Sequence, residues 1–239
     1  MLLLAMFTCL CLFDLTESLA GHFSKTGKLD ENSVAYVVFM ILTLHGSILA
    51  ATAFVLRWNH ISWRTAFGFT WRTLGRSIGW GAFAALVFLP VGILLQWLSM
   101  QFLNALNLET PVQEAVDILQ HAHNATNRAL LVVFAVAIAP VAEEVLFRGV
   151  LYPSIKRLGF PRLALWITSI LFAAIHGNLP VFVPLVALAA ALAMLYEYTD
   201  NLLAPITAHA VFNAVNLLEL FHGGGMVPGT QSCFLHWLP

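Results

Sequence analysis

The sequence predicts an all-α fold, a polytopic bundle of about six or seven transmembrane helices. Of its 239 residues, 60% are hydrophobic and 10% are charged, whereas a soluble domain carries about 25% charged residues. Mean hydropathy is +0.84, and the apolar residues come in runs near the roughly 20 that span a bilayer as a helix. The same composition excludes a disordered chain. Lys+Arg 11 against Asp+Glu 12 leaves no basic excess to bind nucleic acid.

The N-terminal segment, residues 1–33, contains an apolar stretch and a loop expected on the outer side. Its apolar run, 1–13, is short for a span. Ser-Leu-Ala at 18–20 resembles a signal-peptidase site, but the usual positively charged region before it is missing. A signal peptide, a truncated helix and an interfacial helix all remain open for this segment.

The first two spans are expected at 34–56 and 78–103. The segment between them carries four arginines and no acid: Arg57, Arg64, Arg72 and Arg76. The positive-inside rule places this segment in the cytoplasm. The loop 104–128 that follows the second span is acidic, and we expect it outside.

The third span is expected from Ala129 toward Arg148, followed by a second basic, cytoplasmic connection that reaches Arg162. Further spans are expected at 163–176, 181–198 and 202–221. The transmembrane domain is therefore 34–221, and the Gly-rich tail 222–239 is expected to be flexible. The chain is predicted to be an integral multi-pass membrane protein.

Charged side chains interrupt the third span. An ionisable group at the centre of a membrane helix costs roughly 2.5–3.5 kcal/mol and is by default a functional hypothesis. Glu144 and Arg148 lie four residues apart on one helical face, in the favourable order for an ion pair. Glu143 is turned about 100° away and has no cation on its own helix. It must find a partner elsewhere in the bundle.

Two later spans carry polar side chains at a spacing of four. Phe172 and His176 share one face of their helix, and His209 and Asn213 share a face of the last span. Polar groups in membrane helices usually face the bundle interior or a wet cavity. We therefore expect these side chains to converge with Glu143.

The other histidines in or near spans are interpreted as ordinary bundle or loop residues: His45, His121 and His123. No carboxylate shares their spacing along the chain. We do not place them in the site.

Glu143, His176, His209 and Asn213 supply a carboxylate, two imidazoles and an amide, a set that suits acyl chemistry. A carboxylate can take a proton from water, and an imidazole can relay it. An amide and an imidazole N–H can hold the oxyanion of a tetrahedral intermediate. The same set also resembles a carboxylate and histidine zinc site, and the residues alone leave that alternative open.

The region from Val133 to about Leu218 resembles the CPBP family of type II CAAX prenyl endopeptidases and Abi bacteriocin-processing membrane proteases. Three motifs carry the resemblance in the family's order: Glu-Glu-x-x-x-Arg, Phe-x-x-x-His and His-x-x-x-Asn. The resemblance implies a glutamic intramembrane endopeptidase without a metal or other cofactor. In it, Glu143 and His176 would activate water.

The resemblance also implies the roles of the other motif residues. His209 and Asn213 would form the oxyanion site. Glu144 and Arg148 would support the glutamate helix, and Phe172 would accompany His176. The implied partners are the lipid bilayer and a peptide or protein substrate at the membrane, and the implied location is a bacterial cell membrane.

Two other functions remain alternatives to the protease. Some relatives are immunity or scaffold proteins, so the polar cluster can instead stabilise a non-catalytic membrane partner. A transporter with a proton-relay carboxylate is less favoured, because the chain is short and lacks a repeated half.

One feature fits the site poorly. Glu143 is expected toward the cytoplasmic end of its helix, whereas His176 falls about 20 Å along the next helix from Arg162. Either the glutamate helix continues beyond Arg148 to Lys156, or the following helix is tilted or begins within the bilayer. The sequence does not decide between these arrangements.

Overall fold

The computed structural model describes residues 34–108 and 125–221, and every regular element in these two stretches is a helix. This confirms the predicted all-α bundle. The predictions made for residues 1–33, for the tail 222–239 and for His121 and His123 fall outside the described residues.

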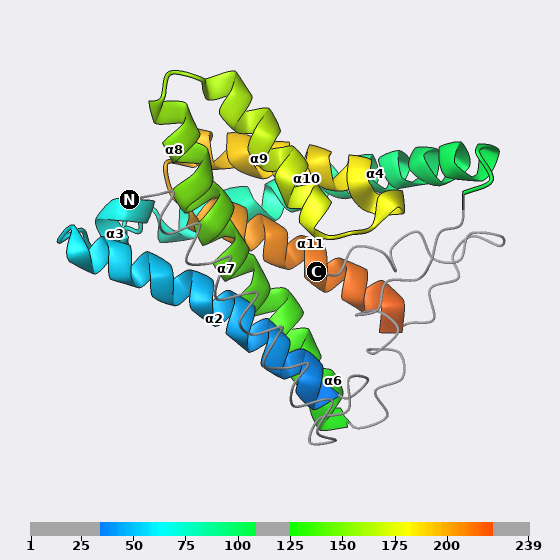
Figure 1. The fold of residues 1–239 in the computed structure, drawn as a ribbon, viewed down its shortest axis with the longest axis horizontal. Helices are drawn as coiled ribbons and strands as arrows, with labels where there is room; N and C mark the ends of the chain where they lie inside the picture. The colour runs from blue at the N-terminus through cyan, green and yellow to red at the C-terminus, as the bar shows by residue number, and fades with distance from the viewer. Residues whose placement is uncertain (1–33, 109–124, 222–239) are drawn as a thin grey trace.

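The chain forms long helices joined by short turns (Figure 1). Among the described residues, three helices precede the acidic loop: α2 (Val34–Trp58), α3 (Trp63–Phe67) and α4 (Leu74–Ala105). One continuous helix follows it, in five segments: α6 (Ala125–Val133), η1 (Phe134–Ile138), α7 (Ala139–Glu144), η2 (Val145–Leu151) and α8 (Tyr152–Arg157). We call this unit, residues 125–157, the glutamate helix. The remaining helices are α9 (Pro161–Ile175), α10 (Leu179–Thr199) and α11 (Leu203–Phe221).

The helices match the predicted spans within a few residues, apart from the third. The glutamate helix runs past Arg148, where its span was predicted to end, and stops at Arg157. There Gly159, with φ 93, turns the chain, and Pro161 begins α9, since proline is favoured in the first turn of a helix. The glutamate helix and α9 thus form a hairpin.

The outer surface of the bundle is apolar, as expected of a membrane protein. In the described part of the chain, three helices are long and apolar enough to cross a bilayer: Leu74–Ala105, Arg128–Arg157 and Leu179–Thr199. Two shorter apolar helices accompany them, Leu42–Trp58 and Pro161–Ile175. On α4, Phe83 and Leu86 are 57% and 61% exposed. An apolar surface this extensive suits contact with lipid and not with water.

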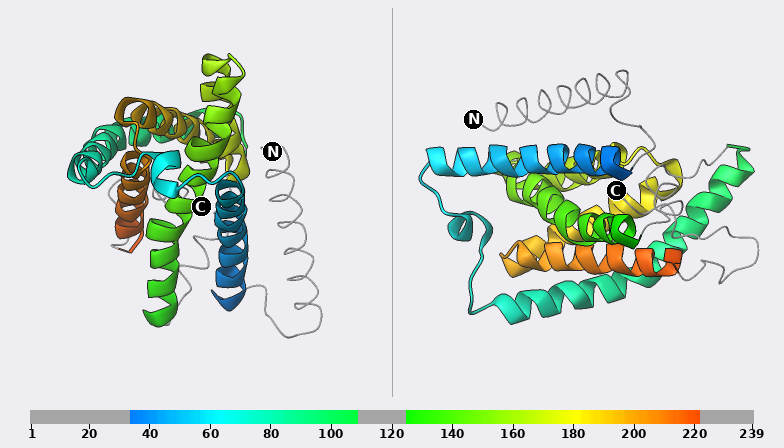
Figure 2. Two further views of the ribbon diagram at one scale, coloured as in Figure 1. Left: turned by 90° about the vertical axis from the view of Figure 1, so that its left-hand side faces the viewer. Right: turned by 90° about the horizontal axis from the view of Figure 1, so that it is seen from below.

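Small residues bring α11 close to α4 (Figure 2). A Cβ added at Gly81 would lie 2.4 Å from the carbonyl oxygen of Ala204. Membrane helices commonly use such small residues to pack closely. Further along, the rings of Phe88 and Phe212 meet at 5.9 Å. The other side of α11 packs against η1 and α7, which points His209 and Asn213 toward the glutamate helix.

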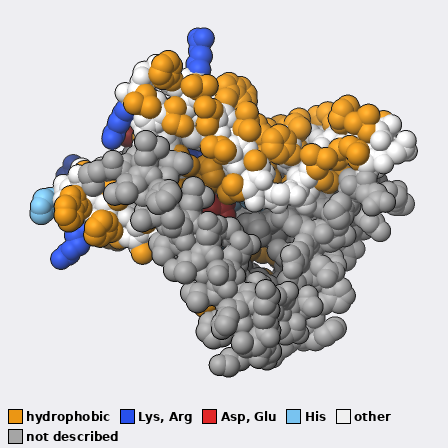
Figure 3. All heavy atoms as spheres, viewed as in Figure 1, with side chains coloured by type: hydrophobic (Ala, Val, Ile, Leu, Met, Phe, Trp, Pro, Cys, Tyr) orange, Lys and Arg blue, Asp and Glu red, His pale blue; other side chains and the backbone are white. Residues whose placement is uncertain are grey.

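The basic connections lie at one end of the bundle. In Figure 3, Lys and Arg side chains gather at the left and upper left, while hydrophobic side chains cover most of the remaining described surface of this face. Lys156 and Glu197 form an ion pair of 2.5 Å that joins α8 to α10. Asn201 donates to the hydroxyl of Thr73 at 3.2 Å. Both basic connections therefore share a side, as the predicted topology requires.

Helix α3 is fixed to two other parts of the bundle through Phe67, and we call this contact the Phe67 anchor. Phe67 is 2% exposed. Its ring lies so close to Gly149 of η2 that a Cβ there would be 2.5 Å away. The backbone N–H of Leu202 donates to the carbonyl of Phe67 at 3.0 Å. The anchor links α3 to the glutamate helix and to the turn between α10 and α11.

Candidate active site

The two glutamates lie between two π-helical segments of the glutamate helix. Glu143 and Glu144 end α7, with η1 before them and η2 after them. π-Helical turns are rare, and they occur frequently at functional sites. Both glutamates are buried, with 6% and 0% exposure. Buried acids of this kind need partners from the surrounding helices.

Glu144 is paired with Arg148, in agreement with their spacing. Arg148 Nη1 donates to Glu144 Oε1 at 2.7 Å, and both side chains are at most 2% exposed. Arg148 Nη2 donates to the carbonyl of Ala189 in α10 at 2.9 Å. The guanidinium carbon also lies 4.8 Å from the ring centre of Phe172. A buried guanidinium with partners on three helices holds the glutamate helix against α9 and α10.

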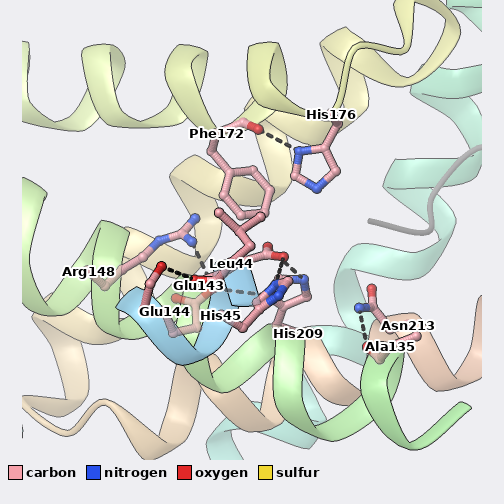
Figure 4. Close-up of polar contacts among 11 residues, drawn as sticks. Leu44, His45, Ala135, Glu143, Glu144, Arg148, Phe172, His176, His209 and Asn213 are labelled. Carbon is pink, nitrogen blue, oxygen red and sulfur yellow. Dashed lines mark hydrogen bonds and ion pairs between the residues drawn. The ribbon is translucent and has the colours of Figure 1, made fainter. Parts of the chain in front are cut away.

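Glu143 finds its partners on other helices. Its Oε1 lies 3.6 Å from Nε2 of His45 in α2, and its Oε2 lies 3.9 Å from Nε2 of His209 in α11 (Figure 4). Oε2 is buried and accepts no hydrogen bond from the part of the chain that the structure describes. Glu143 therefore keeps one carboxylate oxygen available to a substrate or a water molecule.

His45 corrects the prediction that left it out of the site. It was set aside because no carboxylate lies near it in sequence, but α2 packs along the glutamate helix and brings it to Glu143. The two residues are almost a hundred positions apart, and spacing within one helix carries no information on such a contact. The sequence did show that His45 lies within an apolar span, where a polar side chain needs a partner. It did not show which residue that partner is.

His209 contacts both glutamates. Its Nδ1 is 3.0 Å from Glu144 Oε1, and its Nε2 faces Glu143 at 3.9 Å. With 3% exposure, its imidazole is enclosed by the bundle. The structure thus joins a residue expected at the oxyanion site directly to the carboxylates.

His176 stands at the end of α9, above the glutamates in Figure 4. Its Nδ1 lies 2.6 Å from the carbonyl oxygen of Phe172, and the two rings are 4.8 Å apart. If Nδ1 carries the proton, it donates to this carbonyl and Nε2 is free to accept one.

The hairpin of the glutamate helix and α9 places Glu143 and His176 at similar depth. Glu143 lies 14 residues before the end of α8, and His176 lies 15 residues after the start of α9. At about 1.5 Å per residue, these separations are about 21 and 22 Å. Of the two arrangements left open by the sequence, the structure shows the first, because the glutamate helix continues through Lys156.

Phe172 lies at the centre of the cluster. It is fully buried and packs edge-on against Phe147 at 5.2 Å and against His209 at 5.7 Å. Together with its contacts to Arg148 and His176, it touches side chains from three helices. It therefore sets the distance between α9 and the glutamates, which is consistent with a supporting role.

Asn213 lies apart from the glutamates, at the right of Figure 4. Its Nδ2 donates to the carbonyl of Ala135 at 2.8 Å. This carbonyl is available because η1 directs the N–H of Ala139 to Phe134 and because Pro140 has no N–H to donate. Asn213 thus binds α11 to the π-helical segment. A side-chain amide has two N–H donors, so one of them remains for another acceptor.

Asn216 is a buried polar residue that the motifs did not include. It is 1% exposed and lies three residues beyond Asn213 on α11. Neither polar atom of its side chain has a hydrogen-bond partner in the part of the chain that the structure describes. A separation of three residues places Asn216 near Asn213 on the surface of the helix. This spacing was the feature of the sequence that could have identified Asn216.

The arrangement brings the carboxylate of Glu143 near the imidazoles of His45 and His209, with the imidazole of His176 above them in Figure 4. Such a set can take a proton from water and pass it on. Within the described residues, no group of three His, Cys, Asp or Glu side chains is arranged to hold a metal ion. The absence of a metal requirement stays a prediction.

Residues 125–215 match the family model described as type II CAAX prenyl endopeptidase Rce1-like. The matched region contains the three motifs, and its family is the one that they indicated. Over 88 residues the chain is 36% identical to the uncharacterized protein YpbD of Bacillus subtilis (strain 168), an alignment that covers 35% of this chain and 42% of that protein. The chain thus spans less than half of that relative. No solved structure matches the chain. His45 lies outside the matched region.

Proposed function

We propose, with the match to the type II CAAX prenyl endopeptidases as premise, that the chain is an intramembrane endopeptidase. Its substrate would be a membrane-associated or lipidated protein or peptide. The observation that carries the proposal is the surrounding of Glu143. This buried carboxylate lies 3.6 Å from the imidazole of His45 in α2 and 3.9 Å from that of His209 in α11, inside an apolar bundle. A charged group so costly to bury is expected to have a function.

Glu143 is the proposed general base. Its Oε2 accepts no hydrogen bond from the described residues, so it can accept a proton from a water molecule. The water oxygen then attacks the carbonyl carbon of the scissile peptide bond, and its proton passes to Oε2. Because Glu144 is already engaged by Arg148 and His209, it is the less suitable base.

His176 is proposed to carry that proton onward. With Nδ1 bound to the Phe172 carbonyl, Nε2 can accept the proton from Glu143 and donate it to the leaving nitrogen. The C–N bond of the tetrahedral intermediate then breaks and yields a carboxylic acid and an amine. The carboxylate of Glu143 returns to its starting state, so no proton is gained or lost by the enzyme.

His209 and Asn213 are proposed to stabilise the oxyanion. His209, whose Nδ1 lies 3.0 Å from Glu144 and whose Nε2 faces Glu143, would donate to the oxyanion through an N–H on Nε2. Asn213 is held by Ala135 through one N–H and offers its second. Preorganised donors of this kind reduce the cost of charge development in the transition state.

The proposed reaction needs no metal ion or cofactor, because glutamate and histidine supply the proton transfers. Glu144, Arg148 and Phe172 hold the helices that carry the reacting groups. We place the protein in a bacterial cell membrane, on the support of its apolar helices and of the Bacillus relative.

The test is cleavage of fluorogenic CAAX peptides by the protein purified into nanodiscs. A farnesylated peptide and its unprenylated counterpart are compared, with Glu143→Gln as the inactive control. Cleavage by the wild type that is lost in the variant supports the proposal. If prenylated, unprenylated and bilayer-embedded peptides all remain intact, the proposal is wrong.

The second candidate function is a non-catalytic immunity or scaffold protein. The observation that favours it is the use of Glu144, Arg148 and Asn213 to tie helices together. A structural cluster needs only satisfied hydrogen bonds, so Glu143→Gln would leave its biological effect unchanged. A peptidase does not tolerate that substitution.

A further inference from the structure

His45 is a buried imidazole on a helix outside the region that matches the peptidase family. It is 6% exposed, although its neighbours on α2, Leu42 and Gly46, are exposed. On the same helix, Ile48 and Thr52 are also buried. These residues lie three, four or seven positions apart and form the face of α2 that packs on the glutamate helix.

The contact with Glu143 distinguishes His45 from the other buried residues of this face. Its Nε2 is 3.6 Å from Glu143 Oε1, and both side chains are 7% exposed. An imidazole placed within an apolar bundle is costly unless it has a polar partner. Catalytic contacts are often long before substrate binds and tighten in the complex. The distance therefore suits a contact that works during the reaction.

We propose that His45 is a positioning residue for the general base, an inference that rests on the proposed function. Nε2–H holds Oε1 of Glu143 and so fixes the rotation of the carboxylate. Oε2 is then directed toward His209 and the reacting water. Without His45, the carboxylate can rotate about its last side-chain bond, which staggered preferences restrict only weakly. Misplacement of a reacting group by about 1 Å can cost 10²-fold in rate.

His45 needs only its N–H for this role, and other groups carry out the proton transfers. Among the described residues, His45 faces the ionisable group of Glu143, which in turn faces His209. A glutamine side chain places an N–H near the position of a histidine Nε2 and does not titrate. The donor role and a proton-transfer role can therefore be separated by substitution.

The experiment compares His45→Leu and His45→Gln in the full-length protein in nanodiscs. Thr52→Val is the matched control, because Thr52 is buried on the same face and its hydroxyl donates to the carbonyl of Ile48 in its own helix. We expect His45→Leu to lower kcat by about 10- to 100-fold with little change in KM. His45→Gln should restore most of the rate with the wild-type pH profile, and Thr52→Val should match the wild type.

Each outcome decides between the roles. Equal kcat in His45→Leu and the wild type would overturn the inference. An equal loss in His45→Gln would do the same, since it would indicate that His45 transfers a proton. A wild type that cleaves nothing refutes the proposed function instead, which is a separate result.

A second measurement does not depend on activity. Melting temperatures of His45→Leu, Glu143→Gln and the double variant form a cycle. Non-additive changes are expected from residues in contact. Additive changes would show that His45 does not hold Glu143, and the inference would fail on that ground as well.

Discussion

His209 Nδ1 lies 3.0 Å from Glu144 Oε1, the same oxygen that accepts the 2.7 Å hydrogen bond of Arg148. One oxygen of Glu144 therefore contacts both Arg148, on the same helix, and His209, on α11. Glu143, its neighbour in sequence, lies at longer distances from its described histidine partners, 3.6 Å from His45 and 3.9 Å from His209. Adjacent acids with such different surroundings should respond differently to the same substitution.

Glu144→Gln should damage folding first. The substitution removes the negative charge between Arg148 and His209, both of which stay buried. Breaking a buried ion pair typically costs about 3–5 kcal/mol. We expect a clear drop in melting temperature and in the yield of monodisperse protein, measured by fluorescence-detected size exclusion. A stable Glu144→Gln protein that folds well but lacks all activity would contradict the assignment of the two acids.

Glu143→Gln should abolish turnover and leave stability nearly unchanged. General acid–base catalysis contributes typically about 10²–10⁴-fold in rate. The carboxylate of Glu143 lies 3.6 Å from His45 and 3.9 Å from His209. Loss of its charge therefore disturbs only long contacts with these two histidines. The kcat of the purified variant and its melting temperature check the two halves of this prediction. Near-normal turnover would exclude Glu143 as the base.

Asn213→Ala should give a folded, substrate-binding and slow protein. Loss of one oxyanion donor typically costs about 2.7–4 kcal/mol, or 10²–10³ in kcat, with KM little changed. The structural alternative is that Asn213 only ties α11 to Ala135, and a membrane hydrogen bond averages about 0.6 kcal/mol. Thr207→Val is a suitable control, because its hydroxyl bonds its own helix at Leu203. A change in KM alone, or a large drop in melting temperature, would argue against the oxyanion role.

Chelators should leave activity unchanged. The proposed reaction uses Glu143 and histidines for every proton transfer and needs no Lewis acid. Incubation with EDTA or phenanthroline, followed by the peptide assay and by metal analysis of the purified protein, measures this. Activity that a chelator removes and Zn²⁺ restores would refute the glutamic mechanism.

The loop containing Ser62 should be cytoplasmic and the acidic loop containing Gln113 should be outside. The four arginines of the first loop supply the positive-inside signal. In a variant without the three native cysteines, single cysteines at the two positions should react with a membrane-impermeant maleimide from opposite sides. Labelling of both from the same side would overturn the topology.

Helix boundaries could be predicted well from the sequence, because hydropathy depends on local composition. The helices α2, α4, α9, α10 and α11 each end near the predicted limits. The pair Glu144 and Arg148 was also predictable, since a spacing of four places two side chains on one helical face. These properties require only the residues of a single helix.

Contacts between helices could not be predicted in the same way. The pairing of His45 with Glu143 depends on how α2 packs on the glutamate helix. The π-helical segments were also unforeseen, and through them Ala135 becomes the acceptor for Asn213. No rule of spacing within one helix predicts either contact. The depth of His176 became clear only when the length of the glutamate helix was known.

The Phe67 anchor bears on how the protein is made. Phe67 leaves the ribosome well before Gly149 and Leu202, the residues that receive it. The two contacts of the anchor therefore cannot both form until the turn between α10 and α11 has been made. The candidate site depends on a late helix as well, since Glu143 faces His209 in α11. A chain that ends before α11 thus lacks both the complete anchor and His209, so the cluster can be assembled only after most of the chain has been synthesised.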